Sequence, residues 1–89
     1  MNTEDSLKRI AEMLFDLNED RSIPRNIKRG AKQAASEWLL NTTKDFDVRI
    51  YSAINILEEQ VDDPNIPMHA RTQIYNIITQ LETLHSSIS

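Results

Sequence analysis

Hydrophobic residues recur every three or four positions over four stretches of the chain, with polar residues between them. This spacing places the hydrophobic side chains on one face of an α-helix. Because the segments between the stretches are short, sequential helices are expected to pack as antiparallel neighbours. The pattern therefore predicts an all-α protein, an antiparallel four-helix bundle built from two helical hairpins. The four predicted helices cover about 3–18, 24–41, 46–62 and 67–85.

The length of 89 residues fits a single helical domain, 1–89, with one core. Hairpin one is predicted at about 3–41 and hairpin two at about 46–85. Pro24 and Pro67 stand 43 residues apart, one near the start of the second helix of each hairpin. At that offset further residues match, which suggests that the hairpins are related by duplication and by pseudo-symmetry. The matched pairs are Leu14 with Leu57, Asp20 with Asp63, Ile23 with Ile66 and Lys28 with Arg71.

Prolines set the predicted boundary between the third and fourth helices. Pro64 lacks an amide hydrogen and its ring clashes with a preceding helical turn, so the third helix should end near Asp62. Pro67 is suited to the first turn of the next helix. Arg71 follows one turn later, and we expect it to form an ion pair with Asp62 or Asp63. An exposed pair of this kind adds about 0–1 kcal/mol.

Other residues mark the remaining helix ends and the core. Thr3 is the expected N-cap of the first helix, and Thr43 or Asp45 that of the third. The apolar stripe of the second helix places Trp38 at the end of the core, whereas Leu39 lies off that stripe. Gly30 costs about 1 kcal/mol in a helix interior relative to alanine, which suggests close packing by a neighbouring element.

Composition excludes several classes of protein. The chain has no cysteine, so it forms no disulfide and no thiolate metal site. No hydrophobic run approaches the roughly 18–20 residues of a membrane span. The acidic start of the chain does not resemble a secretory signal. We predict a cytoplasmic protein that does not bind membranes.

Basic residues are concentrated in one segment, although the formal net charge is −4. Positions 21–33 hold five basic residues and no acidic one. Four of them lie on the outward face of the second predicted helix, opposite its apolar stripe. Such a face supports sequence-independent contact with nucleic-acid phosphates, although a solvated helix face is the simpler interpretation. These four residues are Arg25, Lys28, Arg29 and Lys32.

A few large hydrophobic residues lie off the stripes. Gathered into one patch they would mark an interface, whereas scattered exposed hydrophobic residues are normal. The third and fourth helices carry the broadest apolar faces, so a partner-binding surface or a homodimer contact is predicted there. The candidates are Tyr51, Ile56 and Tyr75, with Phe15 and Leu39.

Three segments together resemble an archaeal family, uncharacterised protein family 0147. The resemblance extends from the first helix to about Leu84 and implies a compact all-helical domain from an archaeon. It implies no activity, cofactor or functional residue. The segments are Ile23-Pro24-Arg25-Asn26-Ile27, then Val48-Arg49 leading into Ala53-Ile54-Asn55-Ile56-Leu57, and Asp63-Pro64-Asn65-Ile66-Pro67-Met68-His69-Ala70-Arg71-Thr72.

No catalytic, cofactor-binding or metal-binding residue is predicted. His69 and His85 are too far apart on one helix to share a metal, and no phosphate-binding loop or nucleophile motif is present. The acidic residues at the end of the third helix are expected to pair with basic groups rather than hold a cation; they are Glu58, Glu59, Asp62 and Asp63. The sequence favours a non-enzymatic protein-interaction module, with an accessory nucleic-acid-binding protein as the alternative.

Overall fold

The computed structural model describes residues 2–88, which contain helices and no strand. The all-α prediction is confirmed. The first and third helices end within one residue of their predicted ends. The elements are α1 (Thr3–Leu17), α2 (Arg25–Gln33), a π-helix η1 (Ala34–Leu39) that continues α2, α3 (Phe46–Val61) and α4 (Met68–Ile88).

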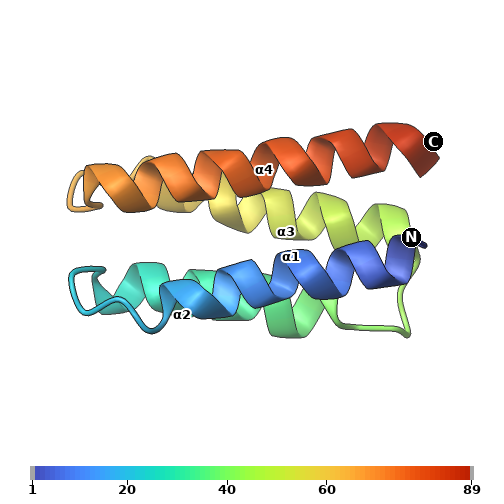
Figure 1. The fold of residues 1–89 in the computed structure, drawn as a ribbon, viewed down its shortest axis with the longest axis horizontal. Coiled ribbons are helices and arrows are strands. Elements are labelled where there is room, and N and C mark those ends of the chain that lie inside the picture. The colour runs from blue at the N-terminus through green and yellow to red at the C-terminus, as the bar shows by residue number, and fades with distance from the viewer. Residues whose placement is uncertain (1, 89) are drawn as a thin grey trace.

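The helices lie side by side as an antiparallel four-helix bundle (Figure 1). The turns 18–24 and 62–67 lie together at one end of the bundle. The two ends of the described chain and the segment 40–45 lie at the other end. Because α1 contacts α2, η1 and α4, and α3 contacts the same three elements, one continuous core runs between the two hairpins.

That core consists of aliphatic side chains from every helix and from both turns. Leu14 and Leu57, which match at the 43-residue offset, are both fully buried. Ile23 and Ile66, one from each turn, are buried as well and close the same end of the core. Phe15 is half-buried and packs against the core rather than forming a surface patch.

Helix ends differ from the predicted caps in small ways. Asn2, not Thr3, is the N-cap of α1, because its Oδ1 accepts a hydrogen bond from the Asp5 amide at 2.8 Å while Thr3 is already helical. Asp45 caps α3, and no side-chain capping bond forms there. Pro24 and Pro67 lie just before α2 and α4, not inside them: their carbonyls accept bonds from the Lys28 and Arg71 amides, at 3.1 and 3.0 Å. At the other end, α4 continues beyond His85 to Ile88.

The second helix of hairpin one changes its winding, which the apolar pattern did not predict. From Ala34 it is a π-helix, as shown by the Leu40 amide bonding to the Ala35 carbonyl, five residues back, at 2.9 Å. A π-helix holds more residues per turn than an α-helix, so each residue rotates less about the axis. This rotation brings Leu39 into the core, where it is fully buried, and moves Trp38 to a half-buried position. The expected roles of these two residues are therefore exchanged.

Gly30 on α2 lies against the Gln60 side chain of α3. A side-chain Cβ at this position would collide with the amide group of Gln60 on α3. The Gln60 Oε1 is buried and accepts no hydrogen bond within the described chain. Glycine therefore leaves room for a side chain of the neighbouring helix at this position, in agreement with the close packing that the sequence suggested.

The two turns are built alike, residue for residue at the 43-residue offset. Asp20 Oδ1 accepts a bond from the Ser22 amide at 2.9 Å, and Asp63 Oδ1 accepts one from the Asn65 amide at 2.8 Å. The carbonyl of each aspartate also accepts a bond from the isoleucine three residues later, at 3.3 and 3.2 Å. Such aspartate turns stabilise a chain reversal locally.

The same two aspartates also join the hairpins to each other. Asp20 Oδ2 lies 2.8 Å from His69 Nε2, and Asp63 Oδ2 accepts a bond from Asn26 Nδ2 at 2.6 Å. Asn26 and His69 are themselves 43 residues apart, so each turn contacts the helix that follows the other turn. This reciprocal pair of contacts gives the bundle end a pseudo-twofold symmetry and supports the predicted internal duplication.

Arg71 does not make the predicted ion pair. Its Nη2 donates to the backbone carbonyl of Asp63 at 3.4 Å, and its Nε is buried without an acceptor among residues 2–88. The Asp63 carboxylate is instead occupied by the Asn65 amide and the Asn26 side chain. The hydrogen bonds that form the turn therefore replace the predicted ion pair between Arg71 and Asp63.

The pH dependence of stability tests the Asp20 contacts. Hydrogen bonds from Ser22, and then His69, lower the pKa of Asp20 from 3.8 to about 2. Because the folded pKa is below the unfolded one, this stabilisation is present above pH 3.8 and is lost as the pH falls towards about 2. The difference in unfolding free energy between the wild type and Asp20→Asn, measured by urea denaturation, should shrink over that range. A difference that stays constant from neutral pH down to about 2 would contradict the assignment.

Candidate protein-interaction groove

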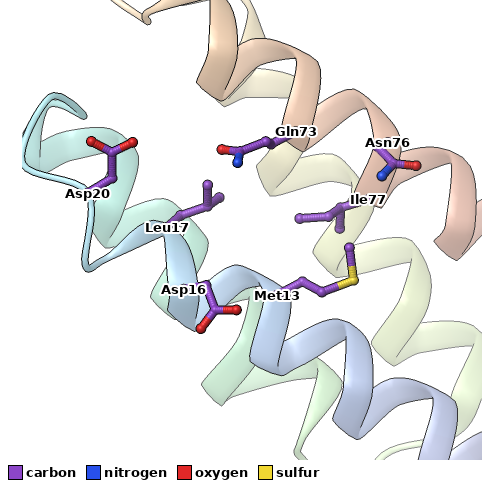
Figure 2. A pocket seen from close by; sticks show the side chains of 7 residues that line it. All are labelled: Met13, Asp16, Leu17, Asp20, Gln73, Asn76 and Ile77. Carbon is purple, nitrogen blue, oxygen red and sulfur yellow. The ribbon is translucent and has the colours of Figure 1, made fainter.

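The junction of α1 and α4 contains a half-open hollow of about 300 Å³ near the two turns (Figure 2). Met13, Leu17 and Ile77 supply apolar contacts, and the polar lining residues are Asp16, Asp20, Gln73 and Asn76. The volume lies at the lower limit of ligand pockets. No serine, threonine, cysteine, lysine or histidine of residues 2–88 is among its lining residues.

Ser22, His69 and Asp20 lie together but do not form a catalytic triad. Ser22 Oγ and Asp20 Oδ2 both approach the same ring nitrogen, His69 Nε2, at 3.1 and 2.8 Å. Ser22 Oγ also donates to Asp20 Oδ1 at 2.6 Å. A triad requires the serine and the carboxylate on opposite nitrogens of the ring. The cluster therefore joins the first turn to α4 and does not activate the serine.

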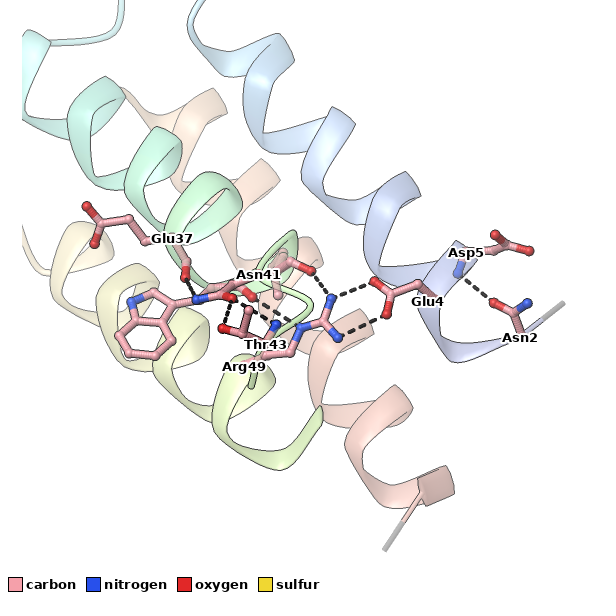
Figure 3. A network of polar contacts seen from close by, with 9 residues as sticks. Asn2, Glu4, Asp5, Glu37, Asn41, Thr43 and Arg49 are labelled. Atoms are coloured by element: carbon pink, nitrogen blue, oxygen red, sulfur yellow. Dashed lines mark hydrogen bonds and ion pairs between the residues drawn. The ribbon is translucent and has the colours of Figure 1, made fainter. Parts of the chain in front are cut away.

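A buried arginine organises the opposite end of the bundle (Figure 3). Arg49 on α3 is 2 % exposed and forms a bidentate pair with Glu4 on α1, through Nη1 at 3.0 Å and Nη2 at 2.5 Å. Its Nε and Nη2 also donate to the carbonyls of Trp38 and Leu39, at 3.3 and 2.7 Å. The guanidinium thus supplies donors to two carbonyls in the last turn of η1, where helical carbonyls lack their usual partners; the Trp38 carbonyl also accepts a bond from the Asn41 amide.

The surroundings of Arg49 explain how this charge is tolerated. Its Cζ lies 5.1 Å from the centre of the Phe46 ring, within the range of a cation–π contact. The hydrogen bonds from Arg49 lower the pKa of Glu4, so the carboxylate is charged at neutral pH. Because Arg49 lies on α3 and donates to Glu4 on α1 and to two carbonyls of η1, it joins α1, η1 and α3. The sequence drew attention to Arg49 only through the family resemblance.

A groove runs along the junction of α3 and α4. It consists of three adjoining hollows of roughly 300–400 Å³ each, which share lining residues. Tyr51 and Glu58 line it from α3, and Tyr75 and Glu82 line it from α4. Asp62, the C-cap of α3, lines it as well. Ile54, Val61 and Ile78 provide an apolar floor. We call this feature the α3/α4 groove.

The groove combines exposed aromatic rings with negative charge. Tyr51 is 63 % exposed and Tyr75 is 51 % exposed, and both lie along it. Its acidic lining residues are Asp47, Glu58, Asp62 and Glu82, and no lysine or arginine among residues 2–88 lines it. His85 is the basic lining residue, and its Nε2 lies 3.2 Å from Asp47 Oδ1. The groove is therefore acidic along most of its length.

The structure brings only part of the predicted interaction set together. Tyr51 and Tyr75 share the groove, whereas Ile56 is half-buried, packs against the core and does not line it. Arg25, Arg29 and Lys32 are exposed on α2, and Lys28 is half-buried. The basic face of α2 is thus a separate surface from the α3/α4 groove.

The acidic cluster at the end of α3 divides between two surroundings. Glu58 and Asp62 line the groove, and Asp63 belongs to the turn and bonds to Asn26. Within residues 2–88, no group of three or more histidine and acidic side chains is placed to hold a metal ion. No helix in the same part of the chain is long and apolar enough to cross a membrane.

Comparison with known proteins places the chain among small archaeal proteins. It is 42 % identical over 82 residues to a UPF0147 protein of Methanothermobacter thermautotrophicus, covering 92 % of this chain and 79 % of the relative. It is 44 % identical over 79 residues to UPF0147 protein MJ1419 of Methanocaldococcus jannaschii, covering 89 % of this chain and 84 % of the relative.

Solved structures show the same fold. A crystal structure from uncharacterized family UPF0147 of Thermoplasma acidophilum superposes with a TM-score of 0.84 at 29 % identity, covering 94 % of this chain and 99 % of that one. The crystal structure of MMP1188, a protein of unknown function, gives a TM-score of 0.83 at 43 % identity, covering 89 % of both chains. The model of uncharacterised protein family UPF0147 matches residues 1–84. The chain therefore belongs to family UPF0147, a family of unknown function.

Proposed function

We propose that the protein is a cytoplasmic, non-enzymatic protein-interaction module that binds its partner through the α3/α4 groove. The observation that supports this most directly is the pair of exposed tyrosines, Tyr51 and Tyr75, along one acidic groove. Tyrosine is enriched at the centres of protein interfaces because it buries a large ring at small entropic cost and retains a polar hydroxyl. The chain places both of its tyrosines there.

Charge determines the kind of partner that suits the groove. Two grooves facing each other in a symmetric dimer would bring Glu58, Asp62 and Glu82 close to their own copies, and like charges at close range oppose association. A partner that presents lysine or arginine side chains has the opposite sign. Such side chains also pack their aliphatic stems and cationic ends on tyrosine rings. A basic helix laid into the groove meets these conditions.

Removal of the tyrosine rings tests the proposal. A tagged chain recovered from its native cells should retain a protein partner, and Tyr51→Ala/Tyr75→Ala should recover at least about tenfold less of it, because such anchors contribute about 2 kcal/mol or more. Leu40→Ala/Met68→Ala is the matched control. It also removes two exposed hydrophobic side chains, but they lie outside the groove. Equal recovery by the tyrosine variant and the control would contradict the proposal.

A further inference from the structure

The chain itself carries a surface that complements the α3/α4 groove. Arg25, Lys28, Arg29 and Lys32 follow one another at i, i+3, i+4 and i+7, which places them on one face of α2. No acidic side chain among residues 2–88 forms an ion pair with any of them. The four cations on α2 therefore remain available for a partner.

The spacing of this basic face matches the groove. Arg25 and Lys32 are seven residues apart, as are Tyr51 and Glu58 on α3, and Tyr75 and Glu82 on α4. Seven residues of helix span about 10.5 Å. A helix of the length of α2 can therefore lie between α3 and α4. Its first and last cations, Arg25 and Lys32, are then separated by the same distance as a tyrosine and a glutamate on one wall of the groove.

We infer that the occupant of the groove is α2 of a second copy of this chain, an inference that rests on the function proposed above. The arginine and lysine ends contact Glu58, Asp62 and Glu82, and their stems lie over Tyr51 and Tyr75. The contact joins two different surfaces, so it is heterologous. Each added copy leaves one groove and one basic face free unless the assembly closes into a ring.

Such an assembly depends on salt. Charges at the surface are screened over about 10 Å at 0.1 M salt and about 3 Å at 1 M. Sedimentation velocity should therefore show concentration-dependent association of the wild type at about 0.02 M salt and mainly monomer at about 0.5 M. A wild type that remains monomeric at about millimolar concentration and low salt overturns the inference.

Charge reversal identifies the two surfaces. Glu58→Lys/Glu82→Lys reverses the groove, and Arg29→Glu/Lys32→Glu reverses α2 at exposed positions. Each pair alone should weaken self-association by about tenfold or more. All four changes in one chain should restore association, because the signs are again opposite. Glu12→Lys/Glu19→Lys, exposed and outside the groove, should leave association unchanged.

The outcomes separate this inference from the proposed function and from the nucleic-acid alternative. If the chain with all four changes self-associates as weakly as the chains with either pair alone, the occupant of the groove is not a second copy. This holds even if Tyr51→Ala/Tyr75→Ala still loses a cellular partner. In that result the groove binds another protein. If reversal of α2 instead abolishes binding of single-stranded RNA and leaves self-association unaltered, the basic face serves nucleic acid and the inference is overturned.

Discussion

Replacing Arg49 with methionine is expected to lower the free energy of unfolding by about 3 kcal/mol, although the two side chains have similar length. The change leaves the Glu4 carboxylate, which is 31 % exposed, without its bidentate partner. It also leaves the Leu39 carbonyl without a donor, whereas the Trp38 carbonyl keeps its bond to the Asn41 amide at 3.2 Å. Buried acceptors that lose their donors cost about 1–3 kcal/mol each.

Urea denaturation followed by circular dichroism measures this loss. Arg9→Met is the matched control, because Arg9 is exposed on α1 and its replacement should change stability by less than about 0.5 kcal/mol. Glu4→Gln removes the charge but keeps a similar shape, and should cost less than Arg49→Met because Arg49 retains its two carbonyl acceptors. If Arg49→Met proves as stable as Arg9→Met, the Arg49 cluster does not hold this end of the bundle together.

Truncation of the matched core leucines should have nearly equal effects. Leu14→Ala and Leu57→Ala each remove a fully buried side chain from equivalent positions of the two hairpins. Each should lower the unfolding free energy by about 3 kcal/mol, within the usual range of 2–5 kcal/mol for such cavities. Equal values follow from the pseudo-symmetry, since both leucines lie near the C-terminal end of the first helix of their hairpin.

Urea denaturation of both variants, beside Glu12→Ala as an exposed control, decides this point. A cost near 3 kcal/mol for one leucine and below about 1 kcal/mol for the other would show that the hairpins contribute unequally to the core. The pseudo-symmetry would then describe the two turns but not the packing between them.

The sequence predicted the helices and most of the core because both follow from local periodicity. The stripe through Leu7, Ile10 and Leu14 is buried as expected, and so is the stripe through Ile50, Ala53 and Leu57. The likeness of the two turns could also be predicted from the sequence, since Asp20 and Asp63 match at the 43-residue offset and form equivalent hydrogen bonds. These features depend on residues within one turn or one helix, which a single sequence displays directly.

A local change in helix winding and the contacts of Arg49 with distant elements were not predicted from the sequence. The π-helix exchanges Trp38 and Leu39, and a fixed rotation of 100° per residue cannot reveal a local change in winding. The sequence did contain one indication of the π-helix. Leu39 is a large aliphatic residue that a regular α-helix would place outside the apolar stripe. Arg49 gave a similar signal, as a single basic residue beside the buried Ile50.

Two residues of the candidate groove, Tyr51 and Tyr75, were candidates from the sequence, whereas the shape of the groove was not predicted. Tyr51 and Tyr75 lay off their stripes, so their exposure could be predicted, but their meeting along one groove depends on how α3 and α4 pack. Ile56 showed the same off-stripe pattern and is nonetheless packed against the core. Helical periodicity places a residue on a face, and only the packed bundle shows which element covers that face.

Site-specific photo-crosslinking in cells tests most directly that the α3/α4 groove is the contact surface. A benzoylphenylalanine in place of Tyr51 or Tyr75 should form an adduct with a protein, and our further inference predicts that the adduct contains residues 25–33 of a second copy. The same probe in place of Lys8, exposed on α1 outside the groove, should form none. Adducts from position 8 as abundant as those from positions 51 and 75, or none from the two groove positions, would contradict the account.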